Sequence, residues 1–189
     1  MGNREDLLAG ARHCLEEKGY LRTTVRDIAS ASGVSMAAIG YHFGSREALL
    51  NRALFAAMDE WSEAVGGLAG EGETAEDRWA DMWDRKIRDF GELRWLWVAS
   101  VEAFVHAQSS PELLAILAEG QRASRREVAA HLRGVPEEEV AESDVRGVGS
   151  VQIALLTGVM VQWLTDPAQA PDGRELARGL RTLASLLEK

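Results

Sequence analysis

The side chains that most often carry out catalysis are few and scattered in this chain of 189 residues. The four histidines are His13, His42, His106 and His131, and none forms a metal pair at helical spacing with an acidic third ligand. The single cysteine, Cys14, lacks a visible general base, and no glycine-rich phosphate loop follows a strand. We therefore expect no catalytic site, no metal site and no cofactor.

Cys14 has a simpler interpretation as a core residue. It falls on the apolar side of a predicted first helix with Leu8, Ala11 and Leu15. A lone cysteine in such a place is expected to be reduced and buried. The alternative is a redox sensor, which would need an exposed and activated thiolate.

Residues 23–50 read as two short helices joined by a glycine-containing turn and followed by a third helix. Thr24 and Asp27 occupy the two positions of a capping box, which predicts that the first of these two short helices begins there. Gly33 can adopt the left-handed conformation that ends a helix, and Ser35 is expected to cap the next one. Because the second helix is short and its exposed side chains are small, it fits a DNA major groove.

Charge is unevenly divided along the chain, whose net charge is −9. Residues 1–52 hold seven Lys or Arg and six Asp or Glu, which gives +1, and the remaining 14 basic and 24 acidic residues give −10. The acidity therefore belongs to residues 53–189, which can face away from nucleic acid. The small positive balance of the head predicts only weak nonspecific attraction to DNA.

The rest of the chain shows helical periodicity and no strand signal of comparable strength. A glycine-rich connection is expected over residues 66–73. Gly91 is expected to end the helix that begins near residue 74. Apolar spacing and caps predict helices over about 45–65, 74–90, 93–107, 110–132, from 138 or 143 to 164, and 172–187. The chain is therefore predicted to be all-α, with about nine helices.

Several strings in one order resemble the DNA-binding region of the TetR family of bacterial one-component repressors. They are Gly19-Tyr20, then the Thr-Thr-Val-Arg-Asp-Ile-Ala segment at 23–29, Gly-Val-Ser at 33–35, Tyr-His-Phe at 41–43 and Ser-Arg-Glu-Ala-Leu at 45–49. The match covers roughly residues 4–54. It implies a three-helix helix-turn-helix head at residues 1–52 and a larger helical ligand-binding and dimerisation body at residues 53–189.

The resemblance also implies which residues meet DNA. Candidates for phosphate contact are Thr24, Arg26, Ser35, Tyr41, His42 and Arg46. Candidates for the groove are Met36, Ala37, Ala38 and Gly40. Many relatives carry Lys where this chain has Met36 and an aromatic residue where it has Gly40, so we expect apolar and backbone contacts to the bases. Taken singly, each candidate is also consistent with a cap, a packing residue or a surface group.

The last two helices carry more apolar surface than one core-facing stripe requires. One set forms a candidate dimer interface: Val148, Val151, Gln152, Leu155, Val159, Gln162, Leu176, Leu180, Leu183 and Leu187. Family members dimerise through these helices in a four-helix bundle, which places two heads on a palindromic operator. The alternative is that every apolar row is buried within one subunit.

All six tryptophans lie outside the predicted head. In the family, helices of the body enclose a ligand cavity, which implies a mainly apolar pocket here. Its candidate residues are Trp61, Trp79, Met82, Trp83, Trp97, Phe104, His106 and Gln121. Any one aromatic residue is more often a core residue than a pocket residue.

These features together predict a sequence-specific DNA-binding transcriptional regulator, most simply a homodimeric repressor that a small, largely apolar ligand releases from its operator. The alternatives are an activator of the same fold and a helical partner-binding or scaffold protein that retains the head. We expect double-stranded DNA and a small-molecule effector as partners. With no signal peptide and no apolar run of membrane length evident, we expect a cytoplasmic location.

Overall fold

The structure is a computed structural model that describes residues 2–66 and 73–188. All regular elements of this described part are helical, which confirms the all-α prediction. The helices are α1 (Asn3–Lys18), α2 (Val25–Ser32), α3 (Met36–Phe43), α4 (Arg46–Gly66), α5 (Ala75–Glu92), α6 (Arg94–Ala107), α7 (Pro111–Arg133), α8 (Glu142–Asp144), the π-helical segment η1 (Val145–Gly149), α9 (Ser150–Thr165) and α10 (Gly173–Leu187). Because α8, η1 and α9 are continuous, the described residues as a whole form nine helical segments, as predicted. Most of the glycine-rich connection predicted over residues 66–73 lies outside the described residues.

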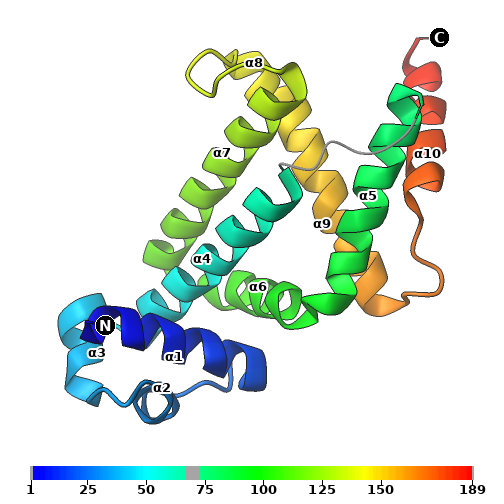
Figure 1. Cartoon of the computed structure of the whole chain (residues 1–189). Helices are drawn as coiled ribbons and strands as arrows, with labels where there is room; N and C mark the ends of the chain where they lie inside the picture. The colour runs from blue at the N-terminus through cyan, green and yellow to red at the C-terminus, as the bar shows by residue number, and fades with distance from the viewer. Residues whose placement is uncertain (1, 67–72, 189) are drawn as a thin grey trace. The chain divides into compact units, whose positions relative to one another are not determined.

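The chain forms two compact units. The first unit comprises the described residues up to Ser62 together with Leu93–Glu119, and the second comprises the described residues of Glu63–Glu92 and Gly120–Lys189. In the first unit, α1, α2 and α3 gather near the N-terminus (Figure 1). In the second unit, α5 packs against both α9 and α10 (Figure 1). The predicted functional division after Arg52 remains a prediction.

One apolar core holds the head helices together. Its fully or almost fully buried side chains come from all four helices: Leu7, Ala11, Cys14 and Leu15 of α1, Ile28 of α2, Ile39 of α3, and Leu49, Leu50 and Ala53 of α4. The burial of Cys14 is as predicted, and that burial raises the pKa of its thiol. This core fixes α2 and α3 on α1, which is what a rigid DNA-binding head requires.

Close backbone approaches shape the second unit. A Cβ atom at Gly173, the first residue of α10, would lie 2.1 Å from the carbonyl oxygen of Ala80 in α5. The amide of the same glycine donates to Asp84 Oδ1 at 2.7 Å. A Cβ atom at Gly149 would lie 2.3 Å from the carbonyl oxygen of Arg125 in α7. Gly173 at the start of α10 and Gly149 at the end of η1 therefore make close contacts with backbone, where only a hydrogen atom fits.

Gly91 does not end its helix as predicted, because α5 continues through it to Glu92. A Cβ atom there would lie 3.3 Å from the indole of Trp163 in α9. The ring of Phe90 lies 6.4 Å from the same indole, centroid to centroid. Gly91 thus makes room for a tryptophan and is a packing residue.

Candidate DNA-binding site

The start of α2 is fixed by the predicted capping box. The Thr24 hydroxyl accepts from the Asp27 amide at 3.2 Å, and the Asp27 carboxylate accepts from the Thr24 amide at 2.9 Å. Asp27 is also paired with Lys18 at the end of α1. At the other end, Gly33 has φ 69°, the left-handed residue that the sequence predicts. Local signals thus set both ends of the first helix of the helix-turn-helix.

We expect the stability of this head to fall with acid in a way that depends on Asp27. The bond from Lys18 and the bonds from Thr24 hold the pKa of Asp27 well below its usual range. A carboxylate with a depressed folded-state pKa stabilises the fold above its unfolded pKa, near 3.9, and this contribution is lost as the pH falls below that value. Thermal melts from pH 7 to pH 3 should show a shallower acid loss for Asp27→Asn than for the wild type. Asp59→Asn, at an exposed carboxylate of α4, is the control, and equal slopes for all three proteins would contradict the expectation.

The α3 helix presents one buried face and one open face. Ile39 is 2% exposed and anchors the helix, whereas Met36 and Tyr41 are 53% and 87% exposed. Ala37 and Gly40 are also exposed, and Ala38 is half-buried. No Cβ clash would arise at Gly40, so nothing in the described structure occupies the space in front of it. The open face is therefore small, largely apolar and accessible.

Ser35 stands at the N-cap position of α3 with extended backbone, as predicted, but its side chain makes no cap bond. The amide that an N-cap hydroxyl would accept from, that of Ala38, donates instead to the Ser35 carbonyl at 3.0 Å. This is a correction to the predicted cap. It leaves the exposed hydroxyl of Ser35 outside the helix's own bonding.

The other predicted phosphate ligands divide into exposed and engaged groups. Thr24 and Arg26 are exposed at the start of α2. Tyr41 lies edge-on to the half-buried His42, with ring centroids 4.9 Å apart. The Arg46 guanidinium, only 18% exposed, donates to the Thr23 carbonyl and pairs with Glu47 at 2.9 Å.

Arg46 therefore ties the start of α4 to the turn before α2, a role that its sequence context does not indicate. A second such contact lies nearby, in which the guanidinium of Arg4 sits over the ring of Phe43 at 5.4 Å from its centroid. Both contacts join residues about 20 or more positions apart, and no local pattern signals them. The first contact joins α4 to the turn before α2, and the second joins α3 to α1.

The eight predicted ligand residues fall in both compact units. Trp61, Trp97, Phe104 and His106 belong to the first unit, and Trp79, Met82, Trp83 and Gln121 to the second. Trp61 and Trp97 are buried and pack edge-to-face with centroids 4.7 Å apart. Trp83 is fully buried, 5.6 Å from the ring of Trp79, whereas Phe104 and Gln121 are exposed. Their grouping around an effector remains a prediction.

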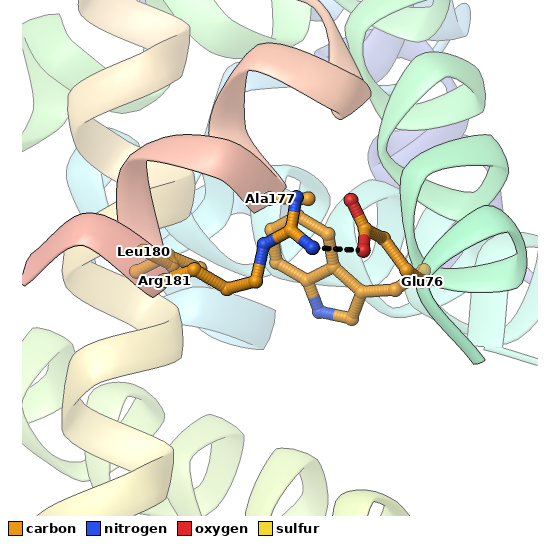
Figure 2. Close-up of a pocket in the computed structure, with 5 residues that line it drawn as sticks. Glu76, Ala177, Leu180 and Arg181 are labelled. Carbon is orange, nitrogen blue, oxygen red and sulfur yellow. Dashed lines mark ion pairs between the residues drawn. The ribbon is translucent and has the colours of Figure 1, made fainter. Parts of the chain in front are cut away.

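A shallow groove of about 180 Å³ lies between α5 and α10 in the second unit. It is lined by Glu76, Trp79, Ala177, Leu180 and Arg181. Figure 2 shows the Arg181 side chain reaching from α10 to Glu76 on α5, with which it forms an ion pair at 2.6 Å. Of the predicted ligand residues, Trp79 is the one that lines this groove.

The predicted dimer residues differ in exposure. Val159 and Leu176 are 1% and 9% exposed, because they pack inside the second unit, so the predicted interface row needs correction at these two positions. The exposed members are Val151, Gln162, Leu183 and Leu187, and the half-exposed ones are Val148, Gln152, Leu155 and Leu180. The open stripe on α9 also includes Ala154 and Val161. A row of apolar side chains thus faces outward from the unit.

The expectation that no apolar segment reaches membrane length also needs correction. The continuous helix Glu142–Thr165 is long and apolar enough to cross a bilayer, judged by length and composition alone. Only 17% of its apolar window is buried within the chain. A single such helix is weak support for a membrane span, because helices of soluble proteins pass the same test.

Comparison with known proteins connects these features. The family model described as "Bacterial regulatory proteins, tetR family" matches residues 7–53, and the one described as "BetI-type transcriptional repressor, C-terminal" matches residues 75–188. The HTH-type transcriptional repressor AcnR of Corynebacterium efficiens is 45% identical over 49 residues, 26% of each chain. The HTH-type transcriptional repressor KstR2 of Mycobacterium tuberculosis is 31% identical over 103 residues, 54% of this chain and 44% of its own. The matched segment thus spans less than half the length of each of these curated relatives.

Solved structures share the whole fold. A TetR-family transcriptional regulator from Rhodococcus sp. superposes with a TM-score of 0.70 at 25% identity, covering 97% of this chain and 98% of its own. The multidrug binding protein EbrR has the same fold, with a TM-score of 0.68 at 20% identity over 96% of this chain and 98% of its own. With one family model on the head and another on more than half of the chain, the protein belongs to the TetR family of bacterial regulatory proteins, which are DNA-binding transcriptional regulators.

Proposed function

We propose that the protein is a cytoplasmic homodimeric repressor that binds a palindromic operator and is released by a small, largely apolar effector. The observation that carries this proposal is the open face of α3, a helix whose opposite side is anchored in the core of the head by Ile39. The names of AcnR and KstR2 as repressors support repression over activation. No catalytic step belongs to the proposal, since the function is binding.

At the operator, α3 enters the major groove. Met36, Ala37 and Gly40 offer methyl and backbone surface, which suits contact with thymine methyl groups and close approach to base edges. Ala38, half-buried, lies at the edge of this surface. Phosphate contacts come from Thr24, Arg26, Ser35, Tyr41 and His42, which position the helix without reading sequence. Arg46 acts mainly by holding α4 in place, because its guanidinium is already bonded within the head.

A second copy of the chain covers the outward apolar row of α9 and α10. Exposed valines and leucines in such number favour burial against a partner, since burial of apolar area drives association. A twofold-symmetric pair would present two α3 helices to half-sites about 34 Å apart, or a small multiple of that distance. The same surface explains the membrane-like composition of Glu142–Thr165 without a bilayer.

The effector acts by preferring one of two arrangements of the dimer. Its pocket is proposed in the second unit, among Trp79, Met82 and Trp83, with polar selectivity from Gln121. A ligand shifts such an equilibrium only through its different affinities for the two states. A coupling of about 1–3 kcal/mol suffices for a switch of about 5- to 150-fold.

Selection of bound sequences from a random DNA pool tests the proposal directly. A dimer of the proposed kind should enrich a palindrome whose half-sites are separated by about one helical turn or a small multiple of it. A reporter gene placed behind that palindrome then separates repression from activation. Recovery of no preferred sequence at low salt would contradict operator binding and favour the scaffold alternative.

Tyr41→Ala should weaken binding to the selected operator by about tenfold, close to the loss expected for one positioning contact. The ring is 87% exposed, so the free energy of unfolding should hardly change. Fluorescence anisotropy with labelled operator measures the affinity, and denaturant unfolding checks the fold. His131→Ala, at an exposed residue of α7 outside the head, is the control. Equal affinities for Tyr41→Ala and the wild type would remove Tyr41 from the site.

A further inference from the structure

The turn that follows α1 is held by a carboxylate from α6. Glu102 Oε2 accepts a hydrogen bond from the Tyr20 amide at 2.8 Å and another from the Leu21 amide at 3.2 Å. These two consecutive amides lie just beyond the end of α1, in a turn that leads directly to α2. A charged acceptor that takes two backbone amides gives a stronger and more directional contact than a neutral one.

The surroundings of this contact are closely fitted. Gly19 has φ +79°, and a Cβ atom there would lie 3.1 Å from Glu102 Oε2. The next residue, Tyr20, is fully buried, and its ring lies 5.9 Å from that of His106, one helical turn after Glu102 on α6. Burial raises the pKa of Tyr20 to about 12, so its ring stays neutral. Two successive turns of α6, through Glu102 and His106, therefore contact the turn between α1 and α2.

The path of the chain gives α6 a special place. The segment Leu93–Glu119, which contains α6, packs in the first unit, while the chain before it and after it belongs to the second unit. Both ends of this segment are therefore joined covalently to the second unit. Within the first unit, α1 packs against α2, α3 and α6, so a displacement of α6 that reaches α1 also reaches the helix-turn-helix.

We propose that Glu102 is the positioning residue that couples α6 to the DNA-binding head. Through the Tyr20 and Leu21 amides, it makes the placement of α1, and with it α2 and α3, depend on the placement of α6. This inference rests on the proposed operator binding, and it names the contact by which that binding is regulated. Glu102 itself need touch neither DNA nor effector.

Linkage supplies a test that needs no known effector. If α6 biases DNA binding, DNA binding must bias α6 by the same factor. Hydrogen exchange of the full-length protein would be measured with and without the selected operator DNA. In the wild type, we expect the amides of α6 to exchange at least about fivefold more slowly with DNA, the lower end of common coupling factors. The amides of α10 serve as an internal reference for any general stabilisation.

Glu102→Ala removes the acceptor and should abolish the DNA-dependent slowing in α6, while the amides of α2 and α3 remain protected by DNA. Glu102→Gln keeps an uncharged acceptor and should retain part of the effect, so it carries the test if the alanine variant fails to fold. Glu112→Ala, at an exposed glutamate of α7 in the same unit, should behave as the wild type.

The outcomes separate the two proposals. If the wild type enriches no DNA sequence, operator binding itself is wrong and the coupling falls with it. If the wild type binds operator but α6 exchanges at an unchanged rate, Glu102 does not couple, although the regulator function stands. Coupling through Glu102 is also overturned if folded Glu102→Ala keeps the full DNA-dependent slowing of exchange in α6. Glu102→Gln replaces it in this test if the alanine variant does not fold. A purely structural role of Glu102 would lower stability without removing this slowing.

Discussion

Val151→Arg should convert the proposed dimer to a monomer and reduce operator affinity by at least about 100-fold. Val151 is 60% exposed on the outward stripe of α9, so an arginine there is tolerated in the isolated subunit. In a dimer, its charge would be buried without a partner, and an uncompensated buried charge costs about 3–5 kcal/mol, which exceeds a 100-fold change. Sedimentation equilibrium measures the association, and anisotropy with the palindrome measures DNA affinity.

The chain offers a matched control for this substitution. Val105 on α6 is likewise 60% exposed, but it lies in the first unit and outside the predicted interface. Val105→Arg should leave the association state unchanged. If both arginine variants remain dimeric with wild-type affinity, the interface is not the outward face of α9. If both become monomeric, the interface extends to α6 and the proposed four-helix arrangement is wrong.

Gly173→Ala should destabilise the fold by about 3 kcal/mol, at the upper end of common overpacking costs. The new methyl carbon would lie 2.1 Å from the Ala80 carbonyl oxygen, and the obstacle is backbone, which no rotamer change can move. Sliding α10 away would break the bond from the Gly173 amide to Asp84. For a chain of this size, the melting temperature should fall by roughly 6–12 °C.

Gly179→Ala is the control within the same helix. Nothing lies within 4 Å of a Cβ atom at Gly179, and alanine is the better helix former, so this variant should be neutral or up to about 1 kcal/mol more stable. Calorimetry or denaturant unfolding of both variants measures the difference. Equal melting temperatures for the two would show that α10 does not pack on α5 through Gly173.

The parts of this fold that can be predicted from the sequence are those determined by three or four consecutive residues. The capping boxes at Thr24 and Asp172 and the left-handed Gly33 follow from the local demands of helix ends, so the sequence suffices to place them. Gly91 shows the opposite case. Its local meaning is a helix stop, but its actual role depends on Trp163, which is distant along the chain.

The candidate site divides along the same line. Exposure of Met36 and Tyr41 follows from helical periodicity around a buried Ile39. The inward use of Arg46 does not, because the Thr23 carbonyl that it binds comes close only after the head has folded. The contact of Glu102 with the turn after α1 spans more than 80 residues, and no spacing rule connects positions so far apart.

The ion pairs of the head bear on how the protein distributes itself over a chromosome. Among the described residues of the head, Arg12, Lys18 and Arg46 already face Glu60, Asp27 and Glu47. Each phosphate that a protein neutralises steepens the fall of log affinity with log salt by about 0.9, and cations already paired within the protein neutralise few phosphates. The difference in affinity between the operator and nonspecific DNA is then set by fit in the groove more than by charge. Such a protein would spend little time on unrelated sequences, so few copies per cell would keep its operator occupied.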